Sequence, residues 1–134
     1  MRMAQDDIIT NHMSERGLLK VLELSNLPFQ PKRLYWLQDI PKFAVRGGHG
    51  HKNLQQAIWS LKGECKLKIF DGTNWSEYIL VDGENLICIP PGCWRELSDF
   101  SIDCIVMVAA SESYDESDYI HDFSDFITWK SEGN

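Results

Sequence analysis

Residues 46–51 read Arg-Gly-Gly-His-Gly-His, and this short stretch decides how the rest of the chain is interpreted. On an extended strand, side chains alternate between the two faces, so His49 and His51 are expected to point the same way and Gly50 the opposite way. The two glycines before His49 allow the backbone to bend and leave space beside the first ring. The stretch therefore predicts two histidines that share a cavity, either as half of a metal site or as a pair of acid–base groups.

The segments around this stretch have the alternation and the turns of β-strands. Apolar residues alternate with lysines in 64–70, and the Asp-Gly-Thr-Asn of 71–74 is a hairpin turn that leads into a further strand at 75–81. The other expected strands are 18–24, 32–37, 43–51, 54–61, 86–89, 94–97 and 102–110. Many short strands at spacings of roughly eight to twelve residues indicate an all-β sandwich or barrel.

The C-terminal part of the chain changes its period. Five apolar residues of 118–129 fall on one helical face, which predicts a short C-terminal helix that closes the domain. They are Tyr119, Ile120, Phe123, Phe126 and Ile127. The stretch 111–125 also contains six acidic residues, which we interpret as a solvated acidic face.

Length and composition set limits on the class of protein. With 134 residues, the chain is expected to form one domain over 15–134, preceded in 1–14 by a loose segment or a short first strand. The sequence has no long apolar run and no targeting pattern, so neither a membrane span nor a signal peptide is expected. The net charge of −7 argues against nucleic-acid binding. Four cysteines without a CxxC pair predict reduced core thiols in a cytoplasmic protein.

The chain has few arginines, and most of them lie in or beside the expected strands. Four of the five sit in or beside strand-like segments, and these are Arg16, Arg33, Arg46 and Arg95. Because a guanidinium group can hold a phosphate or carboxylate with paired hydrogen bonds, this placement suggests recognition of an anionic ligand. The alternative is that each arginine only pairs with a carboxylate of the protein.

The order of residues after the histidines resembles the two motifs of the cupin superfamily, a small double-stranded β-helix. The residues that carry the resemblance are His49, His51, Gln55, Gln56, Gly63, Gly83, the Pro-Pro-Gly of 90–92 and Arg95. The family pattern has two histidines and a glutamate in the first motif and a third histidine in the second, which together hold a metal. Here, Gln55 or Gln56 occupies the glutamate position, and Arg95 occupies the third histidine position.

These replacements bear on the choice between a metal site and acid–base groups. Zinc, iron and manganese sites require three or four imidazole, carboxylate or thiolate ligands. Two histidines with an amide and a cation would leave the ion under-ligated and repelled. We therefore favour acid–base chemistry without a metal or other cofactor, since histidine can act as acid and as base near neutral pH. A metal site and a purely structural pair of buried histidines are the alternatives.

A narrower resemblance covers nearly the whole chain, from about residue 16 to about residue 129. The chain is similar to the nucleotide-sugar 3,4-ketoisomerases, which are cupins that act on dTDP-4-keto-6-deoxyglucose. The similar segments are 32–36 (KRLYW), 45–52 (VRGGHGHK), 54–56, 90–94 (PPGCW), 98–101 and 110–120 (ASESYDESDYI). Two positions depart from the family pattern, because some members have His where Arg95 stands and Glu is common where Gln55 stands.

The resemblance implies a reaction that moves a ketone from C4 to C3 of the sugar through an enediol or enediolate, without a cofactor. Our hypothesis makes His49 or His51 the base at carbon, and the other histidine the proton shuttle between the oxygens. Tyr35 is expected to face the same cavity as a hydroxyl donor, and Arg46 to place positive charge near the enediolate or the diphosphate.

Further residues are expected to bind the dTDP-linked substrate. They are Arg16, Arg33, Lys52 and Arg95 as candidates for the diphosphate, and Gln56. The resemblance also implies a homodimer and a role in the synthesis of amino sugars for a cell-surface polysaccharide. The alternatives are a nucleotide-sugar epimerase, a metal-dependent cupin and a sugar-binding cupin without catalysis.

Overall fold

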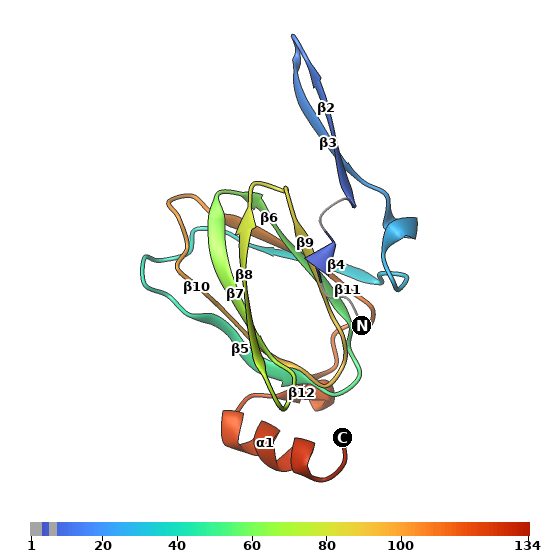
Figure 1. The fold of residues 1–134 in the computed structure, drawn as a ribbon, viewed down its shortest axis with the longest axis vertical. Coiled ribbons are helices and arrows are strands. Elements are labelled where there is room, and N and C mark those ends of the chain that lie inside the picture. The colour runs from blue at the N-terminus through green and yellow to red at the C-terminus, as the bar shows by residue number, and fades with distance from the viewer. Residues whose placement is uncertain (1–3, 6–7) are drawn as a thin grey trace.

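Two antiparallel sheets face each other in the computed structural model, which describes residues 4–5 and 8–134 (Figure 1). The first sheet contains, in spatial order, β1 (Ala4–Gln5), β9 (Leu86–Ile89), β6 (Gln56–Lys62), β11 (Ile105–Ala110) and β4 (Arg33–Leu37). The second contains β12 (Tyr119–Ile120), β5 (Arg46–His51), β10 (Trp94–Ser98), β7 (Glu64–Phe70) and β8 (Trp75–Val81). This arrangement is the double-stranded β-helix of the cupins, so the predicted fold class is confirmed.

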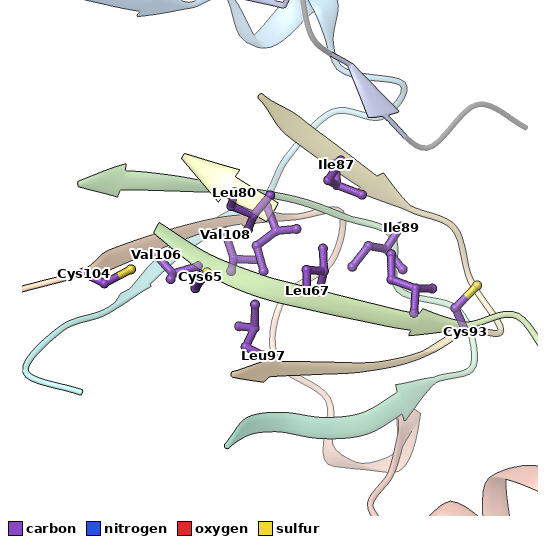
Figure 2. Close-up of a cluster of buried hydrophobic side chains, with 12 residues drawn as sticks. Cys65, Leu67, Leu80, Ile87, Ile89, Cys93, Leu97, Cys104, Val106 and Val108 are labelled. Carbon is purple, nitrogen blue, oxygen red and sulfur yellow. The ribbon is translucent and has the colours of Figure 1, made fainter. Parts of the chain in front are cut away.

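The space between the two sheets is filled by apolar side chains. On β7, Cys65, Leu67 and Ile69 are buried while the lysines between them point outward, as the alternating sequence predicts. Figure 2 shows Cys65 and Leu67 meeting side chains of the first sheet, such as Ile87 and Val108, inside the barrel. The four cysteines are buried and free, as predicted.

A hairpin stands away from the barrel at its N-terminal side (Figure 1). It consists of β2 (Ile9–Ser14) and β3 (Gly17–Leu22) and is followed by the short 3₁₀ helix η1 (Leu24–Asn26). Of the two expectations for the N-terminal segment, a strand is what the structure shows at 9–14; residues 1–3 and 6–7 lie outside the described residues. The division into a segment 1–14 and a domain 15–134 stays a prediction.

The C-terminal helix is shorter than predicted and begins later. Helix α1 (Phe123–Ser131) starts where the Asp122 side chain accepts a hydrogen bond from the backbone N–H of Asp125. The prediction of a helix from residue 118 is wrong, because Glu116–Asp118 forms the 3₁₀ helix η2 and Tyr119–Ile120 forms strand β12. The pairing of β12 with β5 provides sheet hydrogen bonds, and this contact between residues 68 and 70 positions apart overrides the local helical pattern.

Helix α1 packs on the outside of the second sheet, next to β5 and β12 (Figure 1). Phe126 is fully buried there, in a cluster with Trp94 and Ile120. A Cβ atom on Gly50 would lie 2.7 Å from the Phe126 ring, closer than atoms can approach without a shift. Glycine at position 50 therefore lets the helix approach the strand that carries the two histidines.

No helix among residues 4–5 and 8–134 is long and apolar enough to cross a membrane.

Candidate active site

His49 and His51 project from β5 into the barrel, as the alternation predicts. Their ring centroids are 4.8 Å apart and the ring planes are nearly perpendicular, at 88°. His51 is completely buried, and the Nε2 atoms of both rings are buried without a hydrogen-bond partner among the described residues. Gly50 faces the opposite side, against α1. Two imidazole nitrogens are thus available inside the barrel for a ligand.

The interior beside the histidines is a small cavity of about 80 Å³. Its polar side chains come from both sheets, namely Tyr35 on β4, Arg46 and His49 on β5, Gln56 on β6 and Arg95 on β10. Its apolar side chains are Leu37, Ile58, Leu97 and Val108. The sequence left open whether Gln55 or Gln56 occupies the glutamate position of the cupin motif, and it is Gln56 that lines the cavity.

A larger hollow of about 610 Å³ lies at residues of β4, of the loop after β5 and of the segment that leads into β12. Two of its residues, Arg33 and Tyr119, lie close to residues that line the inner cavity. The Arg33 guanidinium lies 5.2 Å from the ring centroid of Tyr35, and the Tyr119 ring lies 5.0 Å from that of His49. A volume of several hundred Å³ is usual for a ligand site, whereas the inner cavity alone is too small.

Asp118 holds His51 in a defined orientation. Its Oδ2 accepts a hydrogen bond from Nδ1 of His51 at 2.9 Å, and its Oδ1 accepts one from the backbone N–H of Asn53 at 2.6 Å. Because a carboxylate only accepts, the proton of the neutral imidazole lies on Nδ1. The lone pair of Nε2, which has no partner among the described residues, is then free to act as a base.

Burial, and next the Arg95 guanidinium, lower the pKa of both His49 and His51 to about 3. Asp118 favours the protonated form of His51 and so acts in the opposite direction. Both rings are neutral at physiological pH and can accept a proton. The fully buried Arg95 has a pKa lowered to about 10 by burial, so it still carries its charge at neutral pH.

Tyr35, Gln56 and Arg95 form a hydrogen-bonded chain beside the histidines. Nε2 of Gln56 donates to the Tyr35 hydroxyl at 2.8 Å, and the Gln56 Oε1 accepts from Nη1 of Arg95. Nη2 of Arg95 donates to the backbone carbonyl of Cys93 at 2.9 Å. The expectation that Tyr35 shares a strand face with Arg33 and faces the histidines agrees with this position.

The other basic residues that the sequence suggested are not all brought together. Arg46 lines the inner cavity and Arg33 the outer hollow, and Arg33 has two buried nitrogens without a partner among the described residues. Lys52 is exposed and lines a separate hollow beside Trp129. Arg16 is exposed in the turn between β2 and β3, on the hairpin that stands away from the barrel.

Sequence reasoning missed Asp118, which it assigned to a solvated acidic face. This interpretation is wrong for Asp118, whose exposed fraction is 9%. It also missed Tyr119, whose ring centroid lies 4.3 Å from that of His51, and His121, which stacks on Tyr119 and bonds to Glu116. A signal was present, because these residues lie in or next to the stretch 110–120 that resembles the ketoisomerases.

The residues at this site do not fit a metal ion. Within the part of the chain that the structure describes, no three His, Cys, Asp or Glu side chains are placed to bind one ion. Arg95, at the third histidine position of the cupin motif, is a buried cation that would repel it.

Comparison with known proteins agrees with this geometry. The family described as "FdtA: WxcM-like, C-terminal" matches residues 5–131. The TDP-4-oxo-6-deoxy-alpha-D-glucose-3,4-oxoisomerase of Aneurinibacillus thermoaerophilus is 38% identical over 113 residues, which are 84% of this chain and 81% of that protein.

Solved structures extend the similarity to the fold. QdtA, a sugar 3,4-ketoisomerase from Thermoanaerobacterium thermosaccharolyticum in complex with TDP, has a TM-score of 0.87 and 32% identity over 93% of this chain and 92% of its own. A mutant of QdtA in complex with TDP-4-keto-6-deoxyglucose has a TM-score of 0.89 and 29% identity over 98% and 96%. The dTDP-4-dehydrorhamnose 3,5-epimerase of Bacillus anthracis, with a TM-score of 0.74 and 17% identity over 83% and 73%, shares the fold. The chain therefore belongs to the FdtA family, the nucleotide-sugar 3,4-ketoisomerases of the cupin superfamily.

Proposed function

We propose that this protein is a sugar 3,4-ketoisomerase that converts dTDP-4-keto-6-deoxyglucose to the dTDP-3-keto-6-deoxyhexose. The observation that carries the proposal is the pair of neutral histidines in the barrel, each with an Nε2 that has no partner among the described residues. One member of this pair, His51, is held by Asp118 in the tautomer that a base requires.

In the proposed reaction, the hydrogen on C3 is acidic because it lies beside the C4 carbonyl. His51 removes this proton through Nε2, and the electron pair of the C–H bond forms an enediolate with negative charge on the C4 oxygen. The protonated His51 then returns a proton to C4, while the C3 hydroxyl passes its proton to the C4 oxygen and becomes the new ketone. The ketone moves between neighbouring carbons, so no external oxidant or reductant is consumed.

The second histidine and the polar side chains of the cavity are proposed to interact with O3 and O4 of the sugar. His49, whose ring is 4.8 Å from that of His51, is proposed to shuttle the proton between O3 and O4. Tyr35 donates its hydroxyl to the developing oxyanion, and the charges of Arg46 and Arg95 stabilise it. The exposed fraction of Arg95 is only 2%, which supports a role at the sugar rather than at the diphosphate.

The nucleotide part of the substrate is proposed to lie in the outer hollow, where Arg33 binds the diphosphate. Two buried guanidinium nitrogens of Arg33, which have no partner among the described residues, support this role. Lys52 and Arg16 lie farther from the cavity, and we propose that either contributes only at the edge of the site or through a second subunit.

We also propose that the protein works as a homodimer in the cytoplasm. Leu34, Trp36 and Leu61, on the outer side of the first sheet, are more than half exposed, and such apolar side chains can be covered by a second copy. The four free cysteines are consistent with a reducing compartment. An aminotransferase acting on the 3-keto group would consume the product, on the way to an amino sugar of a surface polysaccharide.

The test is to supply dTDP-4-keto-6-deoxyglucose in deuterated buffer and to identify the product by NMR. We expect a 3-keto sugar with solvent deuterium at the carbon that receives the proton. An inverted 4-keto sugar would indicate an epimerase, and saturable binding without exchange would indicate a binding protein. His49→Asn and His51→Asn should each reduce turnover by about two to four orders of magnitude with the fold intact.

A further inference from the structure

Gln56 is a buried polar residue whose role the reaction chemistry does not explain by itself. Its exposed fraction is 1%, and its amide lies between the Arg95 guanidinium and the Tyr35 hydroxyl. In the cupin pattern the corresponding position carries a metal-binding carboxylate, yet here the cavity contains an amide of the same size. The difference between an amide and a carboxylate is one hydrogen-bond donor, and this donor is the one that contacts Tyr35.

Arg95 fixes which end of the amide faces Tyr35. A guanidinium group has only donors, so the atom of Gln56 that meets it must be the oxygen. Arg95 is itself fixed by its second bond to the carbonyl of Cys93. The amide nitrogen is therefore turned toward Tyr35, and the alternative orientation would place two donors against each other.

The orientation of the amide in turn fixes the Tyr35 hydroxyl. An amide N–H can only donate, so the Tyr35 oxygen accepts through a lone pair and its proton must point elsewhere. Among the described residues, only Gln56 forms a hydrogen bond with this hydroxyl. Burial raises the pKa of Tyr35, so the proton is retained at physiological pH. The hydroxyl is left as a donor for a ligand in the cavity that it lines.

We infer that Gln56 is a positioning residue, held by Arg95, that keeps the Tyr35 O–H directed at the oxygen of the sugar where negative charge develops. A carboxylate at position 56 would accept the Tyr35 proton and turn the donor away from the sugar. The inference rests on the proposed isomerase function, and it replaces direct substrate binding as the role of Gln56.

The test is a double-mutant cycle of Gln56→Glu and Tyr35→Phe, with turnover measured by product NMR. Gln56→Glu preserves the size of the side chain and its acceptor for Arg95 but removes the donor to Tyr35. We expect each single variant to lower kcat by about 100-fold, the usual loss when one oxyanion donor is removed, with KM little changed. We expect the double variant to be no slower than Tyr35→Phe alone.

Gln55→Glu is the matched control, because it makes the same chemical change one residue away from the cavity. It should keep near-normal turnover. If Gln56→Glu slows the Tyr35→Phe enzyme as strongly as it slows the wild type, its effect is a general one of charge and the inference is wrong. Near-normal turnover of either single variant also overturns it. If Gln56→Glu does not fold, Gln56→Met removes the same donor and takes its place in the cycle.

A spectroscopic measurement tests the hydrogen bond without requiring activity. With 3-fluorotyrosine incorporated, the ¹⁹F signal that disappears in Tyr35→Phe reports the titration of Tyr35. Because the Gln56 N–H stabilises the phenolate, we expect the pKa of Tyr35 to rise in Gln56→Glu and to stay unchanged in Gln55→Glu. An unchanged pKa in both variants refutes the inference. This result can be obtained even if the wild-type protein does not isomerise the sugar, so failure of the function and failure of the inference are separable.

Discussion

Replacing Asp118 by Asn tests the assignment of His51 as the base. Asp118, which fixes the tautomer of His51, is a residue of the site that the sequence did not predict. The carboxylate accepts two hydrogen bonds, from the backbone N–H of Asn53 at 2.6 Å and from Nδ1 of His51 at 2.9 Å. An amide has one oxygen, and the rigid backbone donor is expected to take it. The amide nitrogen then faces His51 and favours the tautomer that carries its proton on Nε2.

This change removes the lone pair that the reaction requires, while the ring stays in place. When the aspartate behind a catalytic histidine is replaced by asparagine in serine proteases, the wrong tautomer lowers kcat by about 10⁴-fold. The base here has a second histidine beside it, so we expect a loss of about 10³- to 10⁴-fold, or roughly 4 to 5.5 kcal/mol of barrier.

The assay is the rate of 3-keto product formation, with solvent exchange at C3 followed by NMR. Thermal unfolding of the same variant shows whether the fold is kept. Asp125→Asn is the control, because Asp125 lies in the same acidic stretch but is exposed, and its turnover should be unchanged. A folded Asp118→Asn enzyme within tenfold of the wild-type rate would refute the proposal that Asp118 sets the tautomer of His51.

Four further outcomes follow from the site and the strand that carries it. Because the pKa values of His49 and His51 are about 3 in the folded state and near 6.5 when unfolded, the unfolded state binds more protons between these values. Stability should therefore fall as the pH falls through this window, by about 1.4 kcal/mol per pH unit for each histidine, and denaturant titrations should show a smaller fall in His49→Asn. Because the histidines have these low pKa values, kcat/KM should not change as the pH passes through 6.5 and should decline only in more acidic buffer. A decline centred at pH 6.5 would contradict the assignment of a buried, neutral histidine as the base. Gly50→Ala should destabilise the fold by about 1 to 3 kcal/mol through the clash with Phe126, whereas Gly48→Ala, whose Cβ would lie 3.9 Å from the nearest side chain, should cost less. Treatment with a chelator should leave turnover unchanged, and a loss restored by added metal would favour the metal-dependent alternative.

The strands and the histidine pair could be predicted because both depend on local periodicity. Alternation places the side chains at 49 and 51 on one face, whatever strand pairs with β5. Likewise, the alternation of apolar residues and lysines in 64–70 predicts which face of β7 is buried. The all-β class follows from such patterns, and the cupin fold was implied by the resemblance of the motif residues to the cupin pattern.

Other features depend on contacts between distant parts of the chain. Asp118 looks like a member of an acidic surface until β12 pairs with β5 and carries it to His51, which lies 67 positions earlier. The arginines looked equivalent in sequence, yet Arg95 is enclosed by the barrel and Arg16 stands on a hairpin outside it. Neither periodicity nor composition distinguishes these cases, because both describe a residue only through its sequence neighbours.

The two-residue strand β12 also has a consequence for the order in which the enzyme becomes active. During synthesis, the ribosome releases β4 to β11 before β12, and these strands contain the inner cavity and both histidines. Asp118 and Tyr119 emerge later, followed by the helix that fixes this end of the chain against Gly50. A nascent or prematurely terminated chain could thus close its barrel around two histidines, yet lack the carboxylate that prepares His51 as a base.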